Sequence, residues 1–277
     1  MTESNRDSER FQTKSSAVDI AEQLSQRLVL IIPALNEQES IATVLSHLPA
    51  VACVIVVDNG STDQTAELAA QEGASVVTEP QRGYGSACLA GLRELDTLDP
   101  QSKWDLVGFL DADFADDSDF LLPMAEPIFK GTADFVLSSR MSGKREKHAM
   151  PPQAIWGNWL ACTLMKWLFR AKYTDLGPMR ILKRSSLEEL HMTDTNFGWT
   201  VEMQIKAMAH RLRIEEVPVT YRQRIGTSKI SGTLTGSVKA GIKILWLIFK
   251  YGLPAWWHMK VMRSPHHSTE SMKASYK

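Results

Sequence analysis

The sequence has few cysteines, almost no net charge and no long apolar run, and each of these absences excludes a class of protein. Its three cysteines, Cys53, Cys88 and Cys162, form no C-x-x-C pair, so neither a disulfide framework nor a cysteine zinc site is indicated. The formal net charge is −1, whereas a general nucleic-acid-binding protein needs a strong basic field. We therefore expect no nucleic-acid partner. The longest apolar run is far shorter than the roughly 20 residues that a membrane-spanning helix needs.

The composition is that of a soluble globular protein, with 44% hydrophobic and 23% charged residues in a chain of 277. No repeat or low-complexity linker divides the chain, so we expect one domain over residues 27–236. Residues 1–26 are polar, carry mixed charge and lack the apolar core of a signal peptide. We expect them to form a disordered N-terminal tail and the protein to be cytoplasmic. Residues 237–277 are expected to be an amphipathic, membrane-interface segment and tail.

Short β-branched runs alternate with amphipathic segments from residue 27 onward. Strands are predicted over 28–32, 53–57, 74–78, 106–110 and 135–138. A helix with Ile41, Val44 and Leu48 on one face is predicted to begin at Asn36. Strands that alternate with helices of this length indicate an α/β fold, with a mainly parallel sheet and helices on both faces.

Two carboxylates, Asp111 and Asp113, follow directly on the apolar run at 106–110. Ligands of open α/β sheets gather at the carboxyl ends of the strands, which is where this pair is expected. Such close carboxylates repel each other unless a cation neutralises them, and Mg²⁺ binds one or two carboxylates together with substrate phosphates. The alternative is a solvated, Asp-rich turn, which Asp116, Asp117 and Asp119 also favour.

Polar clusters also end the first two predicted strands, at residues 33–37 and 58–63. Asp58 is a candidate for contacting a base or ribose, while Ser61, Thr62 or Asp63 is expected to cap the next helix. Arg82-Gly83-Tyr84-Gly85 opens a later helix, and a glycine-rich helix N-terminus favours an anion. We weigh a diphosphate beside Arg82 against a plain glycine-rich turn.

These motifs and several later ones together resemble a known family, over residues 27–250 and in the expected order. The segments are Pro33-x-x-Asn36-Glu37, Val57–Asp63, Asp111-Ala112-Asp113, Ser138-Ser139-Arg140, Thr174–Arg180, Gly198–Met203, Val217–Val219 and Arg224–Ser231. The chain resembles a family 2 glycosyltransferase with the GT-A (nucleotide-diphospho-sugar transferase) fold, in the branch of dolichyl- and polyprenyl-phosphate mannosyl- and glucosyltransferases. The resemblance implies an inverting, metal-dependent transfer of a hexose from a UDP-glucose or GDP-mannose type of donor to polyprenyl phosphate.

The resemblance also implies roles for individual residues. The implied catalytic residues are Asp111, Asp113, Asp175, Arg180 and Glu202, of which Asp111 and Asp113 would bind Mg²⁺ or Mn²⁺. The implied nucleotide-sugar-binding residues are Pro33, Leu35, Asn36, Glu37, Asp58, Arg82, Gly83, Gly85, Ala112, Arg140, Arg224 and Lys229.

The chain departs from this branch at two places. Ala115 stands where close relatives often carry a metal-binding Gln, so the metal would be held by the two aspartates with water, or with Asp116. Gln153 and Ala154 lie near the place of a second arginine. The substitute for that arginine would be a basic cluster, Lys144, Arg145, Lys147 and His148.

The chemistry of the acceptor decides what the implied carboxylates would do. Arg224 and Lys229, on a loop with Gly226, are expected to close over the donor phosphates. A hydroxyl acceptor needs a carboxylate base, for which Asp175 and Glu202 are the candidates. A phosphate acceptor is already nucleophilic at neutral pH, and these carboxylates would then orient Arg180, Lys229 or the sugar hydroxyls. Glu202 as a simple helix-surface residue is the structural alternative.

Two segments have the tryptophans and cations of an interfacial helix. Trp156, Trp159 and Trp167 recur at helical spacing with Leu160, Leu164 and Leu168, and Lys239, Lys243 and Lys250 surround an apolar stretch at 244–249. We expect peripheral contact with the cytoplasmic face of a membrane, and the alternative is that both stripes pack into the core. Three other functions remain open: a soluble glycosyltransferase acting on a small hydroxyl such as a glycerate-type acid, an inactive sugar-nucleotide-binding scaffold, and a sugar-phosphate nucleotidyltransferase.

Overall fold

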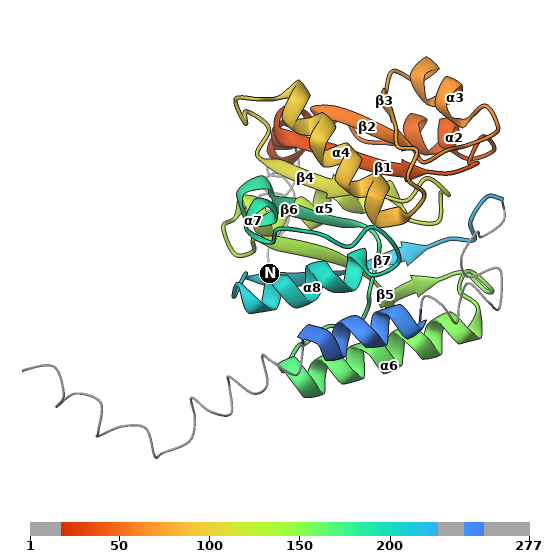
Figure 1. The fold of residues 1–277 in the computed structure, drawn as a ribbon. Coiled ribbons are helices and arrows are strands. Elements are labelled where there is room, and N and C mark those ends of the chain that lie inside the picture. The colour runs from red at the N-terminus through yellow and green to blue at the C-terminus, as the bar shows by residue number, and fades with distance from the viewer. Residues whose placement is uncertain (1–17, 227–240, 252–277) are drawn as a thin grey trace, which may run out of the picture.

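A seven-stranded mixed sheet forms the centre of the molecule, in the order β3-β2-β1-β4-β6-β5-β7 (Figure 1). The computed structural model describes residues 18–226 and 241–251. The strands are β1 (Leu28–Ala34), β2 (Cys53–Asp58), β3 (Ser75–Thr78), β4 (Leu106–Phe109), β5 (Phe135–Arg145), β6 (Arg180–Lys183) and β7 (Ile214–Tyr221). The predicted α/β fold with a mainly parallel sheet is confirmed. Its last two strands had not been predicted, and β6 runs antiparallel between β4 and β5.

Helices cover both faces of this sheet because its central strands are apolar on both sides. The helices are α2 (Ile41–Ser46), α3 (Thr65–Gln71), α4 (Tyr84–Leu98), the 3₁₀ turn η1 (Ser118–Phe120), α5 (Leu121–Phe129), α6 (Pro152–Phe169), α7 (Arg184–Glu189) and α8 (Trp199–Ala209). Successive side chains of a strand point to opposite faces. Val29 and Ile31 of β1 therefore pack with α4, α6 and α8, while Leu30 and Ile32 pack with α2 and α5.

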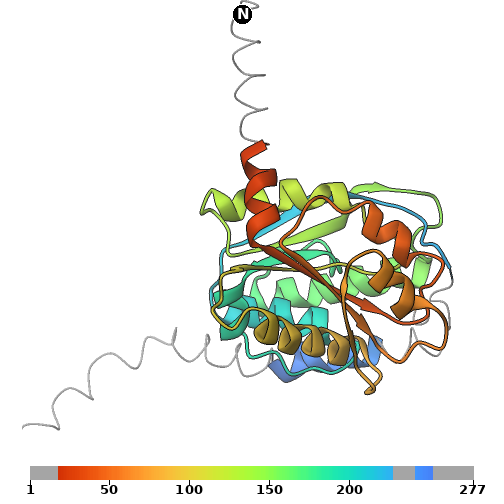
Figure 2. The ribbon, with the colours of Figure 1, turned by 90° about the horizontal axis from the view of Figure 1, so that it is seen from above.

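The expected disordered tail over residues 1–26 is wrong for its last part. Residues 18–27 form a helix that leads directly into β1 (Figure 2). Leu24 is fully buried against the face that carries α2 and α5, and Arg27 pairs with Asp105 at 2.6 Å. Burial of an apolar side chain and an ion pair thus stabilise a segment whose composition alone suggested disorder. Residues 1–17 lie outside the described residues.

The helix predicted to start at Asn36 begins five residues later, at Ile41, with Ser40 at its N-cap. Asn36 has a φ of 53°, a left-handed conformation that an α-helix cannot include. Its side-chain oxygen accepts a hydrogen bond of 2.8 Å from the Thr62 amide, which ties the end of β1 to the end of β2. Because the helix starts only at Ile41, the residues between Ala34 and Ser40 form a loop at the end of β1, where a ligand site is expected.

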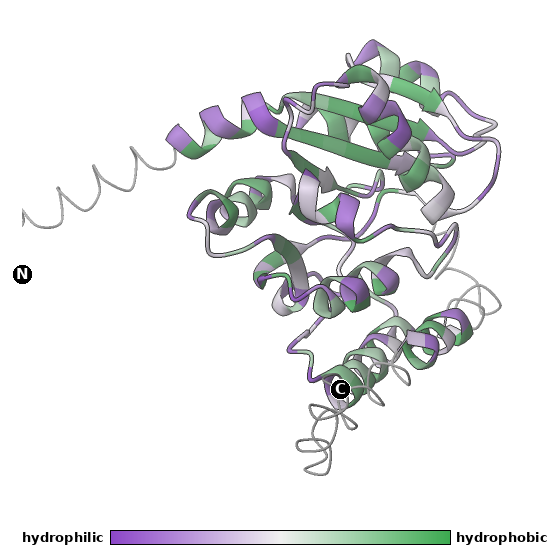
Figure 3. Ribbon diagram, turned by 60° about the vertical axis from the view of Figure 1, so that its left-hand side comes forward, coloured by the Kyte–Doolittle hydropathy of each residue, from purple (hydrophilic) through white to green (hydrophobic). Residues whose placement is uncertain are grey.

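Two helices far apart in the sequence, α6 and the helix over residues 241–251, lie side by side (Figures 1 and 3). Leu247 and Ile248 of the second helix are buried in the protein. Within the part of the chain that the structure describes, no helix is both long enough and apolar enough to cross a bilayer.

Candidate active site

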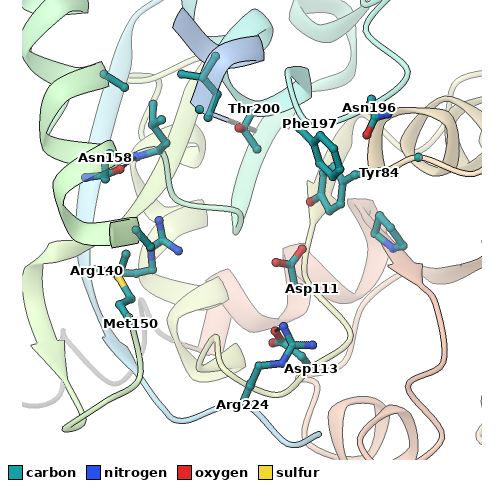
Figure 4. Close-up of a pocket in the computed structure, with 18 of the residues that line it drawn as sticks. Tyr84, Asp111, Asp113, Arg140, Met150, Asn158, Asn196, Phe197, Thr200 and Arg224 are labelled. Atoms are coloured by element: carbon teal, nitrogen blue, oxygen red, sulfur yellow. Dashed lines mark hydrogen bonds and ion pairs between the residues drawn. The ribbon is translucent and has the colours of Figure 1, made fainter. Parts of the chain in front are cut away.

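A cavity of about 660 Å³ lies at the carboxyl ends of β1, β2 and β4. Its polar part is lined from the loops after these strands, from the start of α4 and from β5, and its apolar part from α6 and from the helix over 241–251. Figure 4 shows Asp111 and Asp113 on its floor, with Arg140 and Asn158 on one side and Tyr84, Asn196 and Phe197 on the other. Among the residues implied by sequence, the following line it: Pro33, Leu35, Glu37, Arg82, Gly83, Asp111, Ala112, Asp113, Arg140 and Arg224.

The carboxylates on the cavity floor repel one another. Burial and the neighbouring Asp113 raise the pKa of Asp111 to about 6, and its Oδ1 has no hydrogen-bond partner. Burial and the charge of Asp111 also raise the pKa of Asp116 well above its usual value, and neither of its oxygens has a partner. A cation would neutralise this cluster, so these residues fit Mg²⁺ or Mn²⁺ held by Asp111 and Asp113 together with donor phosphates. No group of three His, Cys, Asp or Glu side chains within residues 18–226 and 241–251 is arranged as a metal site.

Arg224 connects two edges of the cavity. Its Nη1 lies 3.2 Å from Asp113 Oδ2 and its Nη2 lies 3.0 Å from Glu37 Oε1. The amide of Ile225 donates to the backbone oxygen of Asp113 at 2.9 Å, which holds the segment after β7 against the end of β4. The structure thus places a guanidinium where the donor phosphates were expected. Lys229, its expected companion, lies outside the described residues.

Arg140 and Asp175 form a two-pronged ion pair at the side of the cavity. The Nε and Nη2 atoms of Arg140 donate to the two carboxylate oxygens of Asp175, each at 2.8 Å. The guanidinium also lies 5.1 Å from the ring centre of Tyr221. Asp175 is fully buried behind Arg140 and does not line the cavity. It is therefore placed to orient Arg140, whereas the sequence had suggested Arg180 or Lys229 as its partner.

Two other implied catalytic residues do not line the cavity. Arg180 is buried and donates to the backbone oxygens of Gly177, Pro178 and Thr200. It stabilises the turn that leads into β6 and does not line the cavity, although its charge interacts with that of Asp111. Glu202 is fully buried as well and does not line the cavity. A carboxylate that substrate cannot reach is no candidate for the general base. The expectation that either residue touches substrate is not supported by these positions.

Asn59, next to Asp58, is the residue of the β2 end that reaches the cavity. The carboxylate of Asp58 is turned to the Ser61 amide at 3.1 Å, and Asp58 does not line the cavity. Asn59 Oδ1 accepts from the Gly83 amide at 2.7 Å, so it links β2 to the start of α4. The N-cap of α3 is Gln64 and not one of the predicted residues, although Asp63, directly before it, accepts from the Thr65 amide at 3.0 Å.

The glycines at the start of α4 allow a close backbone contact that the sequence did not predict. A side chain at Gly83 or Gly85 would collide with the backbone oxygen of Thr195 or Asp194, and the Ser86 amide donates to Thr195 O at 2.9 Å. These glycines therefore admit a protein loop, while Gly83, together with Arg82, also lines the cavity. Gly85 does not line the cavity.

Several lining residues were missed by sequence reasoning, and they are uncharged: Asn59, Tyr84, Asn158, Asn196, Phe197, Thr200 and Tyr221. Asn196 and Phe197 directly precede the Gly198–Met203 motif, which was the one available signal for them.

The mixed sheet with a carboxylate pair at the end of β4 is the arrangement expected of a nucleotide-diphospho-sugar glycosyltransferase with the GT-A fold. The fold is similar to that of glucosyl-3-phosphoglycerate synthase from Mycobacterium tuberculosis, solved with Mn²⁺, UDP and glucosyl-3-phosphoglycerate. The TM-score is 0.67 at 20% identity, over 85% of this chain and 84% of that chain. The model of glycosyl transferase family 2 matches residues 29–191, and the chain belongs to this family.

Two relatives agree with this assignment along most of their length. An uncharacterized glycosyltransferase of Mycobacterium tuberculosis is 36% identical over 221 residues, which is 77% of this chain and 94% of that protein. The undecaprenyl-phosphate mannosyltransferase of Micrococcus luteus is 28% identical over 245 residues, which is 83% of this chain and 96% of that protein. This protein is thus a family 2 glycosyltransferase that binds a nucleotide sugar, as the sequence motifs had predicted.

Proposed function

We propose that this glycosyltransferase moves a hexose from a nucleotide-diphosphate sugar to polyprenyl phosphate at the cytoplasmic face of a membrane, with Mg²⁺ or Mn²⁺ as cofactor. The observation that carries the proposal is the two-part cavity. Its polar half holds Asp111, Asp113 and Arg224, its apolar half opens between two helices, and Arg140 stands between the halves.

The polar half fits the donor. Pro33, Leu35 and Asn59 border the part of the cavity nearest the ends of β1 and β2, where a base and ribose would lie. Asp111 and Asp113 would hold the metal, which lowers the barrier by stabilising negative charge on the leaving diphosphate. Arg224 adds a fixed positive charge at the same place, where the negative charge develops.

The apolar half fits the acceptor. Gly157, Leu160 and Ala161 of α6 face Ile244 and Leu245 of the helix over 241–251. This lining suits a hydrocarbon chain, and Arg140 lies where the phosphate at the head of such a chain would meet the donor sugar. The relative that is named as an undecaprenyl-phosphate mannosyltransferase supports the same acceptor class.

The positions of the carboxylates also favour a phosphate nucleophile. The two candidate bases, Asp175 and Glu202, are engaged elsewhere and do not line the cavity. A phosphate with a second pKa of about 6 is largely dianionic at neutral pH and needs no base. Its oxygen would attack the anomeric carbon from the face opposite the diphosphate. The bond to the diphosphate oxygen then breaks, and the diphosphate leaves with the electron pair.

Exposed tryptophans on the same helices support a membrane position, and one of them, Trp156, also lines the cavity. Trp156, Trp159 and Trp167 of α6 are 62%, 57% and 75% exposed, and Trp246 of the neighbouring helix is 51% exposed. Exposed cations accompany them, namely Lys166, Arg170, Lys172 and Lys250. The alternative that both stripes pack into the core does not apply to these tryptophans. Amphipathic rings beside cations are typical of interfacial helices.

The test is transfer of label to chemically defined acceptors. The purified protein is incubated with labelled UDP-glucose or GDP-mannose, Mn²⁺ and, in separate reactions, polyprenyl phosphate, the unphosphorylated polyprenol or 3-phosphoglycerate. We expect label in the lipid only with polyprenyl phosphate, and the same result for the exposed control variant Asp119→Asn. Label on 3-phosphoglycerate alone would establish the small-acceptor alternative, and nucleotide-sugar binding without any transfer would establish the scaffold alternative.

A further inference from the structure

The loop over residues 193–198, between α7 and α8, is held in place from inside the protein. Glu202 of α8 accepts hydrogen bonds from the Thr193 hydroxyl and from the Asp194 amide, both at 2.7 Å. Its charge is balanced by Lys206 at 2.8 Å. Asp194 in turn accepts from the amides of Asn196 at 2.8 Å and Gly198 at 3.0 Å, which fixes the turn.

Two further elements hold the same loop from outside. The amide of Ser86 in α4 donates to Thr195 O, and the absent side chains of Gly83 and Gly85 let the backbones touch. On the other side, Lys243 pairs with Asp194 Oδ2 at 2.8 Å. The loop over 193–198 is thus held by α4, by α8 and by the helix over 241–251, and none of these contacts uses the side chain of Asn196 or Phe197.

Those two side chains line the cavity, beside Tyr84 and above Asp111 (Figure 4). Asn196 Oδ1 is buried and has no hydrogen-bond partner. A buried acceptor without a partner costs free energy, which a hydroxyl donor from a ligand would recover. Phe197 adds an apolar ring at the same place. A pyranose offers both features, hydroxyls along its edge and C–H groups on its faces.

The position within the cavity favours the sugar over the base or the lipid. The part of the cavity proposed to hold the base is bordered by Pro33 and Leu35, and the part proposed to hold the lipid is bordered by α6. Asn196, Phe197 and Thr200 lie between these two sides, next to Asp111, whose carboxylate interacts with the Tyr84 hydroxyl. The group attached to a diphosphate at Asp111 would therefore lie against this wall.

We propose that Asn196 and Phe197 form the wall that recognises the transferred sugar, and that Glu202 is the positioning residue of this wall. The inference rests on the nucleotide-sugar donor of the proposed function but not on its acceptor. Asn196 Oδ1 accepts from one sugar hydroxyl and Phe197 covers one face of the ring. Glu202 acts only by fixing Thr193 and Asp194.

The test compares binding of a nucleotide sugar with binding of the matching nucleoside diphosphate. Titration calorimetry with Mn²⁺ measures UDP-glucose against UDP and GDP-mannose against GDP, for the wild type and for Asn196→Ala and Phe197→Leu. For the pair that the wild type binds, we expect each variant to lose about 10-fold or more in affinity for the nucleotide sugar. Affinity for the nucleoside diphosphate should stay at the wild-type level. Loss of both affinities to the same extent, or of neither, would overturn the proposal.

A second variant tests the positioning role. Glu202→Gln keeps the shape of the side chain but removes the charge that Lys206 and the loop donors face, so the preference for nucleotide sugar over nucleoside diphosphate should fall as in Asn196→Ala. The matched control, Glu189→Gln on the exposed side of α7, should change neither affinity. A Glu202→Gln protein that is merely less stable, with an unchanged preference, would refute the positioning role. Failure of the wild type to bind any of the four nucleotides would instead overturn the proposed function.

Discussion

Replacing Asp111 by asparagine should abolish transfer while making the metal-free protein more stable. The reason is the environment of this carboxylate, in which burial and Asp113 raise the pKa of Asp111 from 3.8 to about 6. Each pKa unit corresponds to about 1.4 kcal/mol, so ionised Asp111 destabilises the folded state by about 3 kcal/mol above that pH. Asparagine is nearly isosteric and carries no charge, and it removes this penalty.

The pH dependence follows from the direction of the shift. Between pH 3.8 and about 6 the folded protein binds more protons than the unfolded chain, so its stability falls as the pH rises through this window. The stability then stays at the lower level at neutral pH. Because asparagine does not titrate, the advantage of the variant should be largest at neutral pH and should vanish near about pH 4.

The assay is urea unfolding in EDTA at neutral pH and near about pH 4, for wild type, Asp111→Asn and the exposed control Asp119→Asn. We expect only Asp111→Asn to gain stability, and only at neutral pH. Saturating Mn²⁺ should then stabilise the wild type more than the variant, because binding to the folded state shifts the unfolding equilibrium. A variant that is less stable than wild type in EDTA at neutral pH would refute the interpretation of the cluster as a repulsive site that awaits a cation.

Three further predictions concern the metal, the acceptor and the membrane. Asp113→Ala should abolish transfer, as should EDTA added to the wild type, because the leaving diphosphate would lose its cation; full activity in EDTA would contradict the metal hypothesis. Arg140→Lys keeps the charge but loses the two-pronged pairing with Asp175. The KM for polyprenyl phosphate should therefore rise by about 10-fold, with donor affinity unchanged. An equal loss of donor affinity would instead assign Arg140 to the donor site. Serine at Trp159 and Trp167, which are exposed and do not line the cavity, should weaken sedimentation with anionic liposomes. Wild-type binding should also fall with salt because each basic residue near the surface contributes about 1 kcal/mol, and wild-type protein that stays unbound at low salt would refute the membrane position.

The sequence was most informative where one short segment determines both structure and chemistry. The apolar run before Asp111 predicted β4, its place at the ligand edge and a metal-binding pair at once. By contrast, the short strand β6 has only the four residues Arg180–Lys183, two of them charged, and exists because β4 and β5 flank it. Pairing of this kind is decided by tertiary structure and leaves little pattern in the segment itself.

The same limit applies to the site. Arg140 and Arg224 were implied by motifs and do line the cavity. The positioning role proposed for Glu202 could not be predicted from the sequence, since it depends on donors from Thr193 and Asp194 that meet the carboxylate only after folding. Likewise, Gly83 and Gly85 had a local explanation as a phosphate loop. Their actual neighbour comes from a segment about 110 residues later in the chain.

The insertion of β6 between β4 and β5 has a consequence for the order in which the protein can be assembled. Neither β4 nor β5 touches the other, because each pairs with Arg180–Lys183 instead. A chain still emerging from the ribosome therefore has β4 as an open sheet edge until about 70 further residues have been made, and such edges invite pairing with other chains. Asp111, at the end of that edge, is one feature that opposes such pairing. The carboxylates that we expect to bind the cofactor in the finished enzyme would thus also oppose aggregation of the unfinished one.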